Sequence, residues 1–195
     1  MKVMAATFVA ILLVGCGSEG TKYNIPPGAF NDVSSEQLTE LANLGIPINE
    51  GLHPPTIEGT YSAATLFRIS GNVPNDKVTT FDPMSLKFSG QTSDNTVMVS
   101  YMQPKESGDG LGAFVSGNGQ DFTIYTKIDG MVNGLHFRTA VLYSGSVDAA
   151  GIHFFEMALL FTQKDLDPNH ILLEVDQARV IGERDQLAAR TTSYP

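Results

Sequence analysis

Apolar and polar residues alternate with a period of two over most of the chain from Ile57 onward. The segment 84–89 (MSLKFS) places three apolar side chains on one face of an extended chain, and the segment 122–129 (FTIYTKID) follows a similar alternation. Such alternation indicates β-strands with one buried face. The predicted strands cover residues 57–69, 84–89, 96–102, 111–117, 122–128, 135–144, 152–163 and 171–182.

The segments between the predicted strands are short and rich in turn residues such as Gly, Asn, Asp and Pro. None contains a helical segment long enough for a crossover, so consecutive strands are expected to pair antiparallel as an up-and-down meander. Eight such strands close most economically into a barrel, which removes exposed sheet edges and encloses side chains or one small ligand. We therefore predict a mainly β fold, an eight-stranded antiparallel barrel. A two-sheet β-sandwich is the alternative.

A helical pattern precedes the strands. Ser34 and Gln37 have the spacing of a capping box, and three leucines spaced three residues apart from Leu38 share one helical face. We predict one short N-terminal helix over residues 35–44, which is too short to be stable unless it packs on the body of the domain. Because the strand 152–163 is apolar on both faces, this helix is expected to cover its outer face.

The first residues have the pattern of an export signal. Lys2 precedes an apolar run over residues 3–13, which is too short to span a bilayer. The ending at residues 13–16 (LVGC) resembles the lipobox of bacterial lipoproteins. The resemblance implies that residues 1–15 are a signal peptide, that the bond before Cys16 is cut, and that the Cys16 sulfur carries two acyl chains.

Residues 16–33 are predicted to be a lipidated tether, because paired prolines and several glycines occur there without a hydrophobic period. Residues 34–195 are long enough for a single domain with one substantial core. Gly17 replaces the aspartate that retains lipoproteins in the inner membrane of enteric bacteria. The resemblance therefore favours lipid anchoring at the outer membrane, on its periplasmic or surface face.

The net charge of the chain excludes some classes of binding partner. The chain has 12 Lys and Arg against 21 Asp and Glu, a net charge of −9. Such a surface repels nucleic acid and is not drawn to anionic lipid head groups, so the membrane attachment has to come from the lipid. Cys16 is the only cysteine, which excludes an internal disulfide.

No motif for catalysis is present: the chain has no G-x-S-x-G, no P-loop and no H-E-x-x-H. His136 and Arg138 are expected on a solvated strand face, and His153 and Glu156 would point to opposite faces of a strand. We expect no catalytic residue, no metal and no cofactor. A hydrolase is the third interpretation of the function.

The segment 54–61 (PPTIEGTY) resembles an opening found in uncharacterised exported bacterial lipoproteins. Within it, Gly59-x-Tyr61 is similar to the G-x-W that opens the barrels of the lipocalins and wider calycins, with Tyr in place of Trp. In those families an arginine from the last strand lies over the tryptophan and closes one end of the barrel. The resemblance implies that Gly59, Tyr61 and Arg179 close one end here.

Two predicted strands offer a candidate ligand site. The strand 135–144 presents Phe137 and Tyr143 on one face, and the next strand presents Phe155, Met157 and Phe161. Methionine adapts to irregular shapes and a tyrosine hydroxyl can orient a polar head group, although the same residues would serve equally as a packed core. We predict an envelope lipoprotein that binds a small, partly apolar ligand in its barrel. The alternative is a structural or assembly lipoprotein that binds a protein partner without a ligand cavity.

Overall fold

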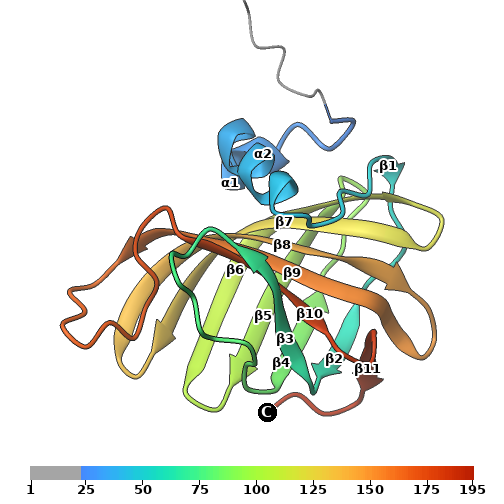
Figure 1. Cartoon of the computed structure of the whole chain (residues 1–195). Helices are drawn as coiled ribbons and strands as arrows, with labels where there is room; N and C mark the ends of the chain where they lie inside the picture. Colours follow the sequence, from blue (N-terminus) through green and yellow to red (C-terminus); the bar gives the residue numbers. More distant parts are fainter. Residues whose placement is uncertain (1–22) are drawn as a thin grey trace, which may run out of the picture.

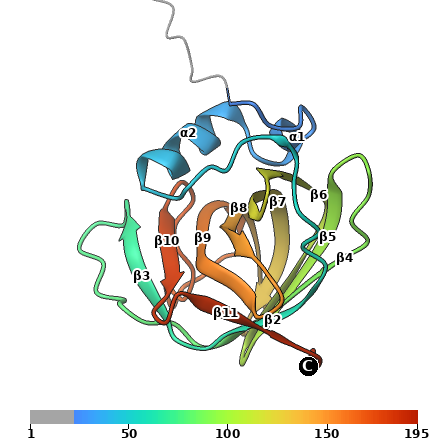
Figure 2. The same ribbon diagram turned by 90° about the vertical axis from the view of Figure 1, so that its right-hand side faces the viewer.

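The alternating segments form a closed antiparallel barrel of eight strands around an apolar interior, as predicted (Figure 2). The computed structural model describes residues 23–195. Around the ring β2 pairs with β4, the strands β4 to β9 pair consecutively, and β11 pairs with both β9 and β2. The strands are β1 (Leu52–His53), β2 (Gly59–Ala63), β3 (Leu66–Gly71), β4 (Met84–Ser89), β5 (Thr96–Gln103), β6 (Glu106–Asn118), β7 (Asp121–Val132), β8 (Leu135–Val147), β9 (Gly151–Lys164), β10 (Ala178–Glu183) and β11 (Leu187–Thr191).

The first and last strands of the ring are each interrupted once. The first divides into β2 and β3, the last divides into β10 and β11, and the pieces pair as β2 with β11 and β3 with β10. This pairing of the first strand with the last closes the sheet on itself, which excludes the sandwich. The short strand β1 lies outside the ring and pairs in parallel with β6.

The predicted boundaries of the last strand are wrong. Residues 171–177 form a loop and the strand runs from Ala178 to Thr191 with a break at residues 184–186. The backbone N–H of Leu172 donates to the carboxylate of Asp167 at 2.7 Å, so this amide is used within the loop and not in a strand ladder. Apolar alternation alone could not reveal this, because the loop side chains Leu172 and Leu173 are also buried.

Helix α2 (Ser35–Asn43) confirms the predicted helix and its capping box, in which Gln37 N donates to Ser34 Oγ and Ser34 N donates to Gln37 Oε1. It lies on the outer wall of the barrel (Figure 1). Its buried Leu38 and Leu41 belong to a second apolar cluster that includes Leu160 of β9. The outer face of the two-sided apolar strand is therefore covered by this helix, as expected. No helix among residues 23–195 is long and apolar enough to cross a membrane.

The predicted tether extends too far toward the domain. A second helix, α1 (Ala29–Asp32), precedes α2, and the side chains of Ile25, Ala29 and Val33 are buried in the outer cluster. A Cβ on Gly28 would overlap the ring of Phe114, so this glycine permits a close contact with the barrel wall. Pro26, Pro27 and Gly28, which suggested a flexible segment, thus belong to a packed turn. The predicted signal peptide and the predicted lipidation site Cys16 lie outside the described residues.

Candidate functional site

One end of the barrel is closed by a tyrosine and an arginine. The Tyr61 hydroxyl donates to the carbonyl of Ile57 at 2.7 Å and accepts from Nη2 of Arg190 at 2.8 Å. The Arg190 guanidinium lies 4.9 Å from the centre of the Tyr61 ring. A Cβ on Gly59 would overlap this guanidinium, so the glycine leaves room for the arginine to cross the end of the barrel.

The arginine of this closure is Arg190 of β11, and the prediction for Arg179 is wrong. Arg179 lies in β10, where Nε and Nη2 donate to the two carboxylate oxygens of Asp76 at 2.8 and 3.1 Å. Its guanidinium lies 5.7 Å from the ring centre of Phe81. Burial raises the pKa of Asp76, but the stronger effect of hydrogen bonds from Arg179 and Arg68 lowers it to about 2. Arg179 therefore fixes the loop that follows β3.

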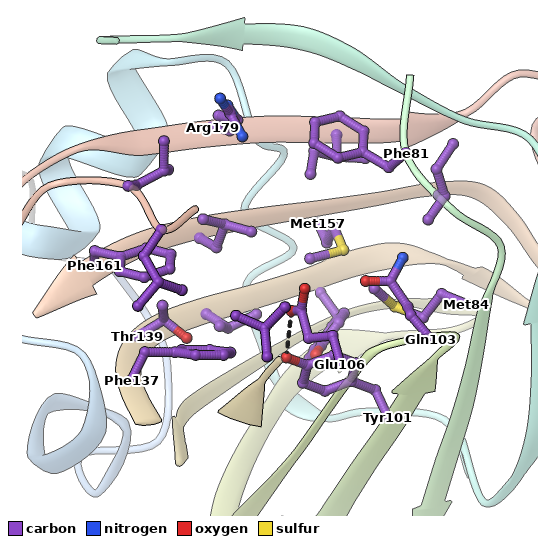
Figure 3. Close-up of a pocket in the computed structure, with 18 of the residues that line it drawn as sticks. Phe81, Met84, Tyr101, Gln103, Glu106, Phe137, Thr139, Met157, Phe161 and Arg179 are labelled. Carbon is purple, nitrogen blue, oxygen red and sulfur yellow. Dashed lines mark hydrogen bonds between the residues drawn. The ribbon is translucent and has the colours of Figure 1, made fainter. Parts of the chain in front are cut away.

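The other part of the barrel interior holds a cavity of about 130 Å³. Figure 3 shows side chains from strands on opposite sides of the barrel pointing into it. Most of its walls are aliphatic or aromatic, with a few polar groups. It is lined by Leu66, Phe81, Met84, Tyr101, Gln103, Glu106, Val132, Phe137, Thr139, Val141, Tyr143, Met157, Leu159, Phe161, Ile171, Leu172, Leu173, Arg179 and Ile181.

Four of the five residues proposed as ligand contacts line this cavity: Phe137, Tyr143, Met157 and Phe161. The rings of Phe137 and Phe161 stack with centres 5.3 Å apart. Phe155 does not line the cavity. Its side chain is 1% exposed and stacks on Tyr143 with ring centres 6.3 Å apart, so it belongs to the packed part of the interior. One face of β9 thus serves both as core and as cavity wall.

The polar side of the cavity is formed by residues that the sequence did not single out. The Tyr101 hydroxyl donates to Oε1 of Glu106 at 2.6 Å (Figure 3). Burial raises the pKa of Glu106, the nearby Asp82 raises it further, and the hydrogen bond from Tyr101 opposes both. Burial and the charge of Glu106 also raise the pKa of Tyr101, which keeps the phenol protonated as a donor.

Glu106 was missed because β6 begins five residues earlier than predicted. Glycines at positions 108, 110 and 112 interrupt the apolar pattern there. A Cβ on Gly108 would overlap the side chains of Tyr101 and Ile128, so its absence lets these two pack closely. Continuing the alternation of Val97, Val99 and Tyr101 to position 103 would have placed Gln103 inside the barrel.

Two loops cover the mouth of the cavity. The loop between β3 and β4 contributes Phe81, and Nε2 of Gln103 donates to the carbonyl of Asp82 in the same loop at 2.6 Å. The loop 165–177 contributes Leu172 and Leu173. It is held to the end of β9 by the ion pair between Lys164 and Glu174 at 2.8 Å.

The histidines show no arrangement for metal chemistry. His136 and Arg138 are exposed, and Arg138 pairs with Asp129 at 3.0 Å. His153 lies 3.0 Å from a carboxylate oxygen of Asp148 in the β8–β9 turn. Within the described part of the chain, no three His, Cys, Asp or Glu side chains are grouped closely enough to hold a metal ion.

Comparison with known proteins does not indicate a function, so the fold and the cavity have to indicate it. No known protein family, no curated protein and no solved structure matches the chain. A function can therefore be inferred from three observations: the cavity, the ion pairs around it and the sequence of the first 16 residues.

Proposed function

We propose that this chain is an exported, lipid-anchored envelope lipoprotein whose barrel binds a small, partly apolar molecule. The LVGC sequence at residues 13–16 supports the export and the anchor. The observation that supports ligand binding is the cavity, whose walls combine aromatic rings with the polar groups of Tyr101, Gln103 and Glu106. A mostly apolar hollow with a few polar groups is typical of small-molecule sites.

The volume of the cavity limits the size of the ligand. Liquid water occupies about 30 Å³ per molecule, so about 130 Å³ corresponds to about four water molecules. This suits a molecule with one ring or a short chain better than a long-chain lipid. The loops that cover the mouth would have to open for entry, and they are held by polar contacts that can break and re-form in water.

Uptake of a small neutral aromatic fluorophore tests the binding function. Residues 17–195 lack the acylated cysteine but keep both apolar clusters of the described structure. We expect this chain to enhance the emission of the fluorophore in a saturable way. Val141→Phe, which places a ring in the cavity, is expected to abolish uptake. Arg138→Phe, on the exposed face of the same strand, is expected to leave it unchanged.

The ligand hypothesis fails if the wild-type chain takes up no probe, or if Val141→Phe and Arg138→Phe behave alike. A thermal denaturation curve of each variant shows whether the variant is folded, so that a loss of uptake is not confused with unfolding.

Substitution of the cysteine tests the anchor. Because the sulfur is the acyl acceptor, Cys16→Ala is expected to block both acylation and cleavage of the signal peptide. Phase separation in detergent measures anchoring, and the mass of the product measures cleavage. Cleavage of the variant at the same bond, with the wild-type protein in the aqueous phase, would contradict a lipid anchor.

A protein partner is the second candidate function, and one observation favours it. The loop 165–177 exposes Leu166, Ile171 and Val175, and 89% of Leu166 is accessible to solvent. Exposed apolar side chains gathered on one loop are a feature of contact surfaces between proteins. Leu166→Ser would weaken such a contact while leaving uptake of a small probe intact.

A further inference from the structure

The charge of the cavity is set by two residues, Glu106 and Arg179, which are the charged residues among those that line it. They lie on opposite sides of the barrel, and Figure 3 shows the Glu106 carboxylate pointing into the space between the aromatic walls. The partner of this carboxylate is the hydroxyl of Tyr101, a neutral donor. No cation balances its charge among the hydrogen bonds and ion pairs of the described residues.

Arg179 is engaged elsewhere. Its Nε and Nη2 hold both oxygens of Asp76, and this forked geometry is the strongest that an arginine and a carboxylate can adopt. In Figure 3 Arg179 lies across the cavity from Glu106. Arg68 pairs with the same carboxylate at 2.8 Å but does not line the cavity. The cavity thus presents one unbalanced negative group and one arginine that is already neutralised.

The walls around Glu106 suit a positive charge. Aromatic rings attract a cation placed over their faces, and five rings line this cavity. Arg179 already lies over the ring of Phe81, and the other four rings belong to Tyr101, Phe137, Tyr143 and Phe161. A charge pair is also stronger in apolar surroundings than in water. A carboxylate in such surroundings is costly when it is alone, so a ligand cation would offset the cost of burying Glu106.

We propose that the ligand is a small organic cation, a protonated amine on an apolar or aromatic body, with its charge on Glu106. This inference rests on the proposed ligand-binding function and specifies the class of ligand. The net charge of −9 favours the approach of a cation over that of an anion. A fatty acid or another carboxylate would meet Glu106 with a like charge and would have to displace Asp76 from Arg179.

Three probes that share a phenyl ring test the proposal on residues 17–195: 2-phenylethylamine, 2-phenylethanol and phenylacetate. Titration calorimetry measures the affinity of each. We expect the amine to bind most tightly. Glu106→Gln keeps the shape and the contact with Tyr101 but removes the charge, so it is expected to weaken amine binding about ten- to a hundredfold. Binding of the alcohol is expected to change little. Glu58→Gln, an exposed glutamate beside the closed end, is the matched control and is expected to change neither.

The pH dependence of wild-type binding provides a second measurement that needs no variant. The titratable or charged groups that face Glu106 are Tyr101, Tyr143, Asp82 and Arg179. Burial raises the pKa values of both tyrosines, so neither loses its proton near neutral pH. Amine affinity is therefore expected to rise with pH as Glu106 loses its proton, and this rise is expected to disappear in Glu106→Gln.

The possible outcomes separate the inference from the function on which it rests. Tighter binding of the alcohol, with no effect of Glu106→Gln, would overturn the cation proposal and leave ligand binding intact. Tightest binding of phenylacetate, lost in Arg179→Gln, would assign the site to anions. If none of the three probes binds, both the cation proposal and the ligand-binding function are rejected.

Discussion

At each end of the barrel a buried tyrosine contacts a charged side chain, with opposite results. At the closed end the Tyr61 hydroxyl has two partners, Ile57 and Arg190, and the guanidinium also covers the ring. At the cavity end Tyr101 holds Glu106 through one hydrogen bond, and space remains beside the carboxylate. The hydrogen-bonded Tyr61 and Arg190 close their end of the barrel. The carboxylate of Glu106 has no cationic partner in its apolar surroundings and is therefore available to a ligand.

The largest expected contrast lies along β9, between Phe155 in the packed interior and Phe161 in the cavity wall. Phe155→Ala leaves a new void among buried rings and is expected to lower the free energy of unfolding by about 3–5 kcal/mol. Phe161→Ala enlarges a space that already exists, so we expect a loss of about 2 kcal/mol or less together with altered probe uptake. Urea denaturation measures both values. Equal losses with no change in uptake would mean that the cavity end is simply core.

A smaller effect is expected for the closure. In a double-mutant cycle, Tyr61→Leu and Arg190→Met are expected to show a coupling free energy of about 1–3 kcal/mol, from the hydrogen bond and the cation over the ring. The parallel cycle of Tyr61→Leu with Arg179→Met is expected to show almost none, because Arg179 pairs with Asp76. Similar coupling in the two cycles would contradict this division of roles.

The smallest expected effect is the loss of stability that the buried carboxylate of Glu106 causes as pH rises. Because burial raises the pKa of Glu106, folding favours its protonated form. Stability is therefore lost as pH rises from the unfolded pKa, about 4.3, through the raised folded value. Glu106→Gln removes this loss, so the variant is expected to gain stability relative to wild type between pH 4 and pH 8.

Glu174 supplies a control of opposite sign. The hydrogen bond and charge of Lys164 lower the pKa of Glu174, so its ionised form is favoured by folding. Glu174→Gln is expected to lose stability relative to wild type over the same rise in pH. The denaturant midpoints of wild type and both variants, measured at pH 4 and pH 8, test these two expectations. A Glu106→Gln difference that does not change with pH would show that the carboxylate is not strained by burial.

The sequence predicted the elements whose patterns are local. The strand alternation, the capping box at Ser34 and the covered outer face of β9 follow from contacts within a few residues or from one periodicity. Arg190 was missed because the last strand breaks at residues 184–186, where Gln186 has a φ of 58°, and resumes beyond the apparent end. Glu106 was missed because glycines interrupt the apolar pattern at the start of β6. The packing of Ile25 was missed because Gly28 contacts the ring of Phe114, which is distant in the sequence and near only in the folded chain.

If Cys16 is the anchor that we propose, the packing of residues 23–33 on the barrel wall limits how far the domain can stand from the membrane. Tyr23 packs against the outer apolar cluster, to which Leu38 and Leu41 of α2 also belong. An anchor at Cys16 would be joined to this point by seven peptide units, which reach about 25 Å when fully extended; a tether ending at residue 33 would have reached more than twice as far. A tether of this length would hold the outer apolar cluster, and not the mouth of the cavity, within about 25 Å of the anchor.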